Sequence, residues 1–272
     1  MDYKLKCNMV RRDIVTCIGT LGVGHIGGSL SIVEALVALY YKHMNVDPKN
    51  PKMEGRDRLV VSKGHAGPAV YSILAEKGYF DKQLLLTLNK SGTLLPSHCD
   101  MNKTPGVDMT AGSLGQGFSC AVGMAVGGKI KNDGAKIYAI IGDGESQEGQ
   151  IWEAAMYAGS KHLSNLIAFT DYNKMQIDGT VEEVNDIAPL DKKWEAFGWK
   201  VINVADGNDF DQVDAAISEA KKSEDKPVMI ILNTVKGKGV SFIEAAGVGN
   251  HSMSISPEDM ERALTELGGK AL

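Results

Sequence analysis

The second half of the chain alternates short apolar segments with longer amphipathic ones, and this alternation constrains the fold more than any other feature. The apolar segments that have the length of strands are 137–141, 166–170, 200–204 and 227–233. The segments between them that have helical periodicity are 147–162, 192–197 and 210–222. Short apolar strands joined by helices form parallel sheets that are covered on both faces. We therefore predict an α/β fold with a parallel sheet and helices on both faces.

The first half is less regular, but it contains further helices and one strand. Helical patterns cover residues 3–18, 31–41, 66–77 and 113–131, and a short strand is expected over 58–62. Near the end, Ser256 followed by Pro257 and two acidic residues is typical of a helix N-terminus. No linker rich in Pro, Ser or Gly divides the chain. We therefore expect residues 1–272 to form a single domain.

Composition excludes several classes of protein. An apolar content of 43% and a net charge of −5 over 272 residues are typical of a globular chain and argue against a general nucleic-acid binder. No apolar stretch is long enough to span a membrane, and the charged N-terminus lacks the apolar core of a signal peptide. The four cysteines show no C-x-x-C spacing. We expect a cytoplasmic protein with reduced cysteines.

The 31 glycines gather in short loops, several of which directly follow predicted strands. Gly142-Asp-Gly144 ends one strand, Asp171-Tyr-Asn173 ends the next, and Thr234–Gly239 follows the last. In parallel sheets, ligands bind outside the carboxyl ends of the strands. These loops are therefore the expected position of a binding site.

Asp143 and Asn173 lie 30 positions apart at the ends of consecutive strands. Carboxylate and amide oxygens suit Mg²⁺, which also takes oxygens from phosphate groups. Gly144 leaves room for a diphosphate near a helix N-terminus. An ordinary Asp-Gly turn and an asparagine helix cap are the alternatives for each residue alone. The two residues together favour a site for a metal ion and a diphosphate.

An earlier loop, Gly22-x-Gly24-x-x-Gly27, matches the dinucleotide-binding fingerprint, and Asp47 lies downstream at a suitable distance. Residues 42–47 are too polar for the strand that should deliver this acid. We therefore disfavour a nicotinamide cofactor.

Four of the six histidines lie in loops of small residues, whereas His43 and His162 lie at predicted helix ends. The four are His25, His65, His98 and His251. A single loop histidine is usually a plain surface residue, but four in such loops are harder to explain in that way. Histidine suits phosphate contacts, proton transfer and hydrogen bonds to sugar hydroxyls.

Taken together, these motifs resemble the N-terminal, thiamine diphosphate-binding portion of a transketolase. Gly142-Asp143-Gly144 followed at distance by Asn173 is similar to the thiamine diphosphate motif. The transketolase-like signatures, in the family's order, are Gly24-His25, Ser62-Lys-Gly-His65, Pro96-Ser-His98, Gly112-Ser-Leu-Gly-Gln-Gly117 and His251-Ser252. The resemblance covers essentially the whole chain and implies a thiamine diphosphate-binding fold. It differs in detail, because Ile26 and Cys99 stand where proline is common and residues 245–251 differ in length and sequence from the usual pattern.

The resemblance implies a role for each matched residue. Mg²⁺ would be bound by Asp143, Asn173 and the backbone carbonyl of Met175. The residues that would contact the cofactor are His65, Gly144 and His251 at the diphosphate, Asn173 beside it, and Gly112 and Leu114 at the rings. His25 and His98 would contact the donor's hydroxyls, and His25 and His251 would transfer protons. Glu148 would join an interface network that reaches the cofactor's activating acid, or would be a solvated helix residue.

An intact transketolase continues into a pyrimidine-binding domain and a C-terminal domain, which this chain does not contain. The resemblance therefore implies the N-terminal subunit of a split enzyme that transfers a two-carbon ketol unit between sugar phosphates. A C-terminal subunit would supply the pyrimidine-binding domain and the activating glutamate, with two copies of each chain, and this chain alone would be inert. The alternatives are a subunit of a 2-oxo acid dehydrogenase, a deoxyxylulose-phosphate synthase-like fragment, and a non-catalytic binding module.

Overall fold

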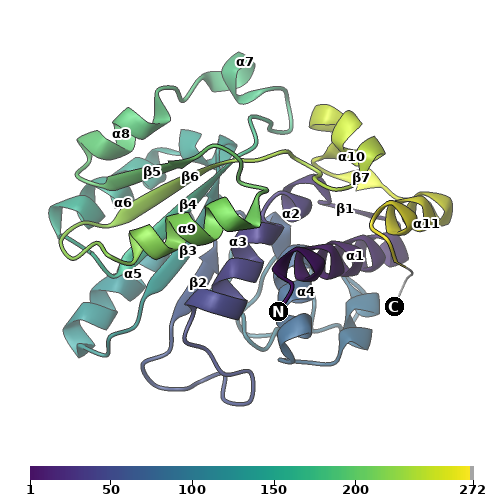
Figure 1. The fold of residues 1–272 in the computed structure, drawn as a ribbon, viewed down its shortest axis with the longest axis horizontal. Coiled ribbons are helices and arrows are strands. Elements are labelled where there is room, and N and C mark those ends of the chain that lie inside the picture. Colours follow the sequence, from purple (N-terminus) through teal and green to yellow (C-terminus); the bar gives the residue numbers. More distant parts are fainter. Residues whose placement is uncertain (270–272) are drawn as a thin grey trace.

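A five-stranded parallel sheet runs through the centre of the structure, a computed structural model that describes residues 1–269 (Figure 1). Its strands are β2 (Arg58–Val61), β3 (Ile137–Gly142), β4 (Leu166–Tyr172), β5 (Lys200–Val204) and β6 (Val228–Asn233). They lie in the order β2-β3-β4-β6-β5, and every neighbouring pair is parallel. Gly142 lies opposite Asp171, and Tyr172 lies opposite Asn233. The carboxyl ends of β3, β4 and β6 therefore form one edge.

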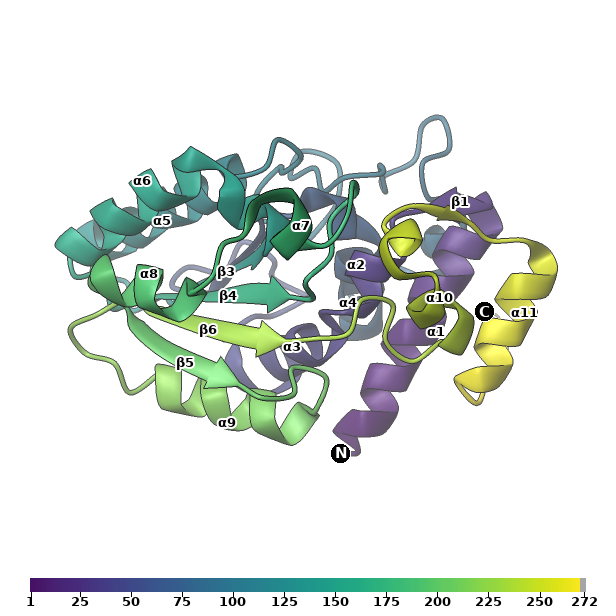
Figure 2. The same cartoon turned by 90° about the horizontal axis from the view of Figure 1, so that it is seen from above.

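Helices cover both faces of this sheet, as Figure 2 shows for α9 on one side and α5, α6 and α8 on the other. Alternate strand residues point to opposite faces, because side chains in a strand have a period of two. Thus Tyr138 and Ile140 join one buried apolar cluster, whereas Ile137, Ala139 and Ile141 join the other. The longer helices are α1 (Tyr3–Leu21), α4 (Gly67–Lys77), α5 (Gln116–Lys131), α6 (Gly149–Ser160), α8 (Leu190–Ala196), α9 (Phe210–Ala220) and α11 (Pro257–Glu266). The predicted α/β architecture is confirmed.

The two terminal regions of the chain lie side by side. The short strands β1 (Val23–Gly24) and β7 (Met253–Ser254) pair in antiparallel fashion. Helices α1 and α11 also pack together. This arrangement places the first glycine loop next to the loop that contains His251. The remaining short helices are α2 (Gly27–Leu30), α3 (Val33–Ala38), α7 (Val181–Asn185) and α10 (Ser241–Ala245).

Two predicted helices differ from the structure in a way that matters for the site. The segment 31–41 is not one helix, because it contains α3 and then a π-helical turn over Leu39–His43. The predicted helix 113–131 begins only at Gln116. Gly115 has a left-handed conformation (φ 84°), so residues before it cannot belong to the same helix. The other predicted bounds agree with the structure to within three residues, and the strand predicted over 200–204 matches β5 at both ends.

The fingerprint for a dinucleotide lacks its structural context. The first glycine, Gly22, ends helix α1 instead of following a strand. Asp47 lies in a segment without regular structure. Within residues 1–269, no helix is long and apolar enough to cross a bilayer.

Candidate active site

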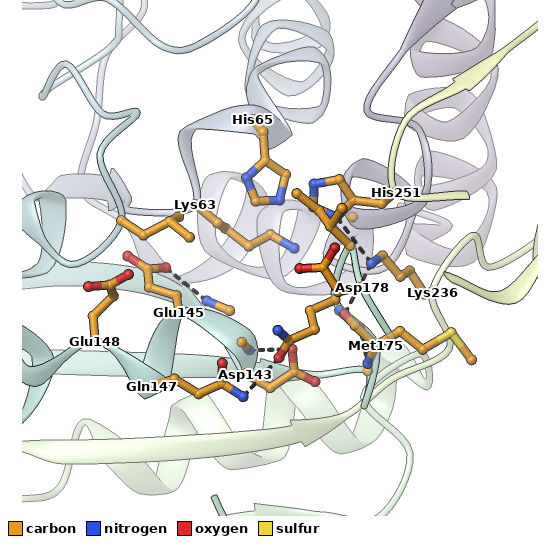
Figure 3. Close-up of a pocket in the computed structure, with 17 residues that line it drawn as sticks. Lys63, His65, Asp143, Glu145, Gln147, Glu148, Met175, Asp178, Lys236 and His251 are labelled. Atoms are coloured by element: carbon orange, nitrogen blue, oxygen red, sulfur yellow. Dashed lines mark hydrogen bonds between the residues drawn. The ribbon is translucent and has the colours of Figure 1, made fainter. Parts of the chain in front are cut away.

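A cavity of about 210 Å³ opens at the carboxyl ends of β3 and β4 (Figure 3). The predicted site residues that line it are His65, Leu114, Asp143, Gly144, Glu148, Asn173, Met175 and His251. Gly112, His25 and His98 do not line it directly. The imidazole of His25 lies against those of His65, His98 and His251, and Gly112 lies beside His98. The structure therefore brings all the predicted residues into one region.

Asp143 directly follows β3, and its side chain is almost completely buried. Its carboxylate accepts hydrogen bonds from the backbone N–H groups of Gly144, at 2.8 Å, and Lys174. Burial, reinforced by the nearby charge of Asp171, nevertheless raises the pKa of Asp143 to about 7. A buried carboxylate of this kind gains stability from a cation at its free lone pairs. The Gly144 N–H is engaged by Asp143, so it is not a free donor for an anion. Gly144 contributes mainly by having no side chain, because a Cβ atom there would lie 3.2 Å from the Cβ of Gln176.

Asp171 ends the neighbouring strand β4 and is also fully buried, but its partners lie within the chain. The side chains that donate hydrogen bonds to it are those of Lys63 (2.5 Å), Ser31 (2.6 Å), Thr234 (2.5 Å) and Asn173 (2.9 Å). Burial opposes the charge, yet the Lys63 ammonium and the hydroxyl donors hold the pKa of Asp171 below its usual value. The hydrogen-bonding capacity of this carboxylate is therefore satisfied within the chain.

The bond from Asn173 to Asp171 also fixes which way the Asn173 amide faces. Nδ2 is the donor to Asp171, so Oδ1 is the atom that accepts from the N–H of Met175, at 3.1 Å. An amide oxygen has two lone pairs and can accept a further partner. Asn173 Oδ1 is thus available as an oxygen ligand beside Asp143.

The carbonyl of Met175 already faces a positive charge. Lys236 Nζ donates to this carbonyl at 3.0 Å and lies 3.3 Å from Nδ1 of His251. Both partners of Lys236 are neutral acceptors, so its charge is not cancelled by them. Burial, and next the charge of Lys63, lower the pKa of Lys236 to about 8.

These donors fit a hard cation that is shared with a ligand. Among residues 1–269, no group of three or more His, Cys, Asp or Glu side chains could hold a metal ion. The chain offers instead one carboxylate, one amide oxygen and one carbonyl, which is an incomplete set for octahedral Mg²⁺. The remaining oxygens would come from water and from a phosphate-bearing ligand. The cation is expected to bind together with such a ligand.

The four loop histidines form a cluster. The ring centroid of His25 lies 5.4 Å from those of His65, His98 and His251, and that of His65 lies 4.9 Å from that of His251. Burial is the main cause that lowers the pKa of all four, to about 4 for His251. At neutral pH the cluster is therefore uncharged, and each ring has one nitrogen that donates and one that accepts.

Glu145 connects the loop before α5 to the end of β3. Its buried carboxylate accepts from Ser62 Oγ (2.5 Å), from the N–H of Gly115 (2.8 Å) and from the N–H of Gly142 (3.0 Å). These bonds place Leu114 on the cavity. Glu148, three residues further on, is exposed at the cavity rim.

Four buried residues of the site are not among the residues predicted from the sequence: Lys63, Glu145, Asp171 and Lys236. A signal exists for Asp171, which follows a predicted strand as Asp143 does. A lysine two residues before a loop histidine or inside a glycine loop gives no sign that it will be buried. The pairing of Lys63 with Asp171 is visible only in the fold.

A parallel sheet with a cation-and-anion pocket at its carboxyl edge defines an α/β protein that binds a phosphorylated cofactor. Residues 3–271 match the family described as "Transketolase, thiamine diphosphate binding domain". The chain belongs to this family. Its cofactor class is accordingly thiamine diphosphate.

Similar proteins refine this assignment. The chain is 56% identical to the 6-deoxy-6-sulfo-D-fructose transketolase subunit SqwG of a Clostridium species, over 98% of this chain and 96% of that protein. It is 41% identical to one subunit of the apulose-4-phosphate transketolase of Actinobacillus succinogenes, with the same two coverages. The transketolase of Leishmania mexicana superposes with a TM-score of 0.93 at 28% identity, over 99% of this chain and 42% of that chain.

The length of the match separates two kinds of relative. The chain spans nearly the whole of the two subunits but only about two fifths of the solved transketolases. One of these, from Pichia stipitis, was solved with sedoheptulose-7-phosphate and gives a TM-score of 0.91 at 31% identity, over 99% of this chain and 41% of that chain. The predictions of a thiamine diphosphate-binding fold and of one subunit of a split ketol transferase are confirmed.

Proposed function

We propose that this chain binds the diphosphate of thiamine diphosphate together with Mg²⁺ and completes its active site with a second, C-terminal subunit. The observation that carries the proposal is that one cavity is lined both by three oxygen atoms, those of Asp143, Asn173 Oδ1 and the Met175 carbonyl, and by the ammonium group of Lys236. Oxygen ligands for a cation and an unneutralised ammonium for an anion are what a metal diphosphate requires. The similarity to proteins named as transketolase subunits supports this assignment.

Bound thiamine diphosphate would supply the nucleophilic carbon and electron sink for cleavage of a ketose between C2 and C3. The residues of this chain would orient the donor and move its protons. Lys236 faces Nδ1 of His251, so the neutral ring carries its proton on Nε2. His251 can therefore donate a proton from Nε2 to an oxygen atom of the ketose, whereas neutral His25 and His98 can accept protons from the hydroxyl groups of the ketose.

The partner would supply what the cavity lacks for chemistry. We propose that a C-terminal subunit contributes the pyrimidine-binding domain and the activating glutamate, that Glu148 lies at this interface, and that the assembly contains two copies of each chain. The exposed position of Glu148 at the cavity rim agrees with such a contact. Four free cysteines agree with a cytoplasmic setting.

Among possible donors we favour 6-deoxy-6-sulfo-D-fructose over a sugar phosphate of the pentose class. The reason is the higher identity to the protein named for that sugar, 56% against 41% for the apulose-4-phosphate relative. The histidines would meet the carbonyl and hydroxyls near C1 to C3, which such ketoses share. Discrimination at the terminal sulfonate or phosphate would then rest with the partner.

The experiment that tests this proposal is capture of the tagged chain from cells of its own organism, with intact-mass analysis of the bound protein. We expect a second chain of comparable size in equal amount. The reconstituted complex should transfer a two-carbon unit from 6-deoxy-6-sulfo-D-fructose, with apulose-4-phosphate as the comparison donor. Either chain by itself should be inactive. Activity of the pure chain, or no stoichiometric partner, would overturn the proposal.

A further inference from the structure

Three segments of the chain meet at a buried contact between Gly27, Gly237 and Asn250. The Gly237 N–H donates to the carbonyl of Gly27 at 3.0 Å, and Asn250 has no exposed surface (0%). A Cβ atom on Gly27 would lie 2.1 Å from Asn250 Oδ1, and one on Gly237 would lie 3.0 Å from Asn250 Nδ2. The amide of Asn250 therefore fills a space that only two glycines leave open.

The same amide fixes the path of the chain by hydrogen bonds. Asn250 Nδ2 donates to the carbonyl of Lys236 at 3.0 Å and to the carbonyl of Ile243 at 2.9 Å. One side chain thus holds together both ends of the segment 236–250. Because a buried carbonyl left without its donor costs free energy, removal of the amide would release this segment.

Each member of the contact adjoins a group of the proposed site. Gly27 follows His25 by two residues, Gly237 directly follows Lys236, and Asn250 directly precedes His251. The His25 and His251 ring centroids lie 5.4 Å apart, and Lys236 Nζ lies 3.3 Å from His251 Nδ1. The backbone contact therefore lies directly beside the cluster formed by the side chains of His25, Lys236 and His251.

We propose that Asn250 is a positioning residue, which holds His25, Lys236 and His251 in register through its buried amide. Its meaning for catalysis rests on the proposed function. Displacement of reacting groups by about 1 Å can cost on the order of a hundredfold in rate.

The first test does not depend on activity or on a partner. The full chain is treated with diethyl pyrocarbonate, and carbethoxylation of each histidine is followed by peptide mass spectrometry. Asn250→Asp keeps the shape of the side chain but replaces its two N–H donors with at most the single O–H donor of a protonated carboxyl, and Asn250→Ala loses both the shape and the donors. Asn165→Ala is the control, because Asn165 also donates from Nδ2 to a backbone carbonyl, that of Ala125, at 2.8 Å. Asn165 precedes β4 and so lies at the end of that strand opposite to the cavity.

In both Asn250 variants we expect His25 and His251 to react at least threefold faster than in the unmodified sequence, with no change in Asn165→Ala. Asn250→Asp reacting like the unmodified chain would reduce Asn250 to a space-filling role and overturn the inference. Equal acceleration in the Asn165 control would overturn it as well. Circular dichroism is used to check that each variant is folded. If Asn250→Ala does not fold, the test is decided by Asn250→Asp.

The second test uses the reconstituted complex. We expect Asn250→Asp to lower kcat for ketol transfer at least tenfold with a smaller change in KM for the donor, and Asn165→Ala to change neither more than twofold. Equal kinetic losses in the two variants would contradict a positioning role. If the complex of the unmodified chain shows no ketol transfer, the proposed function fails, whereas the modification test still decides the role of Asn250.

Discussion

Two groups of atoms face each other in the pocket, which Glu145, Glu148 and Asp178 also line: oxygen atoms at the strand ends, and nitrogen atoms of lysine and histidine side chains (Figure 3). The oxygen wall consists of Asp143, Asn173 Oδ1 and the Met175 carbonyl, at and just beyond the ends of β3 and β4. The nitrogen wall consists of Lys63, His65, Lys236 and His251. The difference supports the proposal that a cation and an anion bind side by side, and each wall can be tested by itself.

The largest effect is expected on the oxygen wall. Asp143→Asn removes the only carboxylate among the three proposed metal ligands. The nearby carboxylate of Asp171 cannot replace it, because Asp171 is already bound by side chains of the chain itself. We expect Mg²⁺-dependent binding of thiamine diphosphate to weaken at least a hundredfold in the complex, measured by calorimetry.

The matched control is Asp133→Asn, at the opposite end of β3, where the side chain caps the N–H of Ala135. It should change the Kd less than twofold. Unchanged Mg²⁺-dependent binding in Asp143→Asn would refute the metal assignment and favour a binding module of another kind.

The next effect is on the stability of the chain instead of on ligand binding, and it concerns the ion pair of Lys63 and Asp171. Asp171→Asn leaves the buried ammonium of Lys63 without its counter-charge, and breaking such a pair typically costs about 3–5 kcal/mol. Urea unfolding of the chain should show this loss in stability. The double variant Lys63→Met with Asp171→Asn should recover part of it, since no unpaired charge remains. A loss below about 1 kcal/mol in the single variant would show that Lys63 finds another partner.

A smaller effect is expected from the nitrogen wall. Lys236→Met removes the ammonium that faces the Met175 carbonyl and should raise the Kd for thiamine diphosphate on the order of tenfold, since a charge-assisted hydrogen bond contributes about 1.5–3 kcal/mol. Lys238→Met, two residues further along the same loop, is the control and should have little effect. Equal Kd values for the two variants would place the anion elsewhere.

The smallest effect is a pH dependence of stability. Burial and then Lys236 hold the pKa of His251 at about 4 in the folded chain, below its value of 6.5 in an unfolded one. The unfolded chain therefore binds more protons between these values, so stability falls as the pH is lowered from 6.5 to 4. With allowance for the partly exposed ring, His251→Gln should reduce this loss by about 1 kcal/mol. Identical pH profiles in thermal unfolding would contradict the shift.

The fold and part of the oxygen wall could be predicted because they follow from local patterns. Apolar strands separated by helices define the parallel sheet, and consecutive neighbouring strands bring Asp143 and Asn173 together. The insertion of β6 between β4 and β5 has no local signal. It is this strand order that brings Lys236 to the carbonyl of Met175.

Helix boundaries were missed where tertiary contacts compete with periodicity. Ser31 lies in an apolar helical pattern, but its hydroxyl donates to Asp171 at the sheet edge and α2 has ended before it. The predicted helix from 113 fails at Gly115, whose N–H is bound by Glu145 instead of entering a helical turn. Both losses of regular structure occur where the chain builds the pocket.

The pairing of β1 with β7 has a consequence for biosynthesis. Val23 lies opposite Ser254, so the loop of His25 finds its neighbour only after about 230 further residues have been made. At roughly 5–20 residues per second, a ribosome needs on the order of ten seconds or more for that stretch. A nascent chain interrupted before His251 would carry the proposed metal ligands without the complete histidine cluster. The contact between the His25 and His251 rings can therefore form only in chains whose translation has passed residue 251.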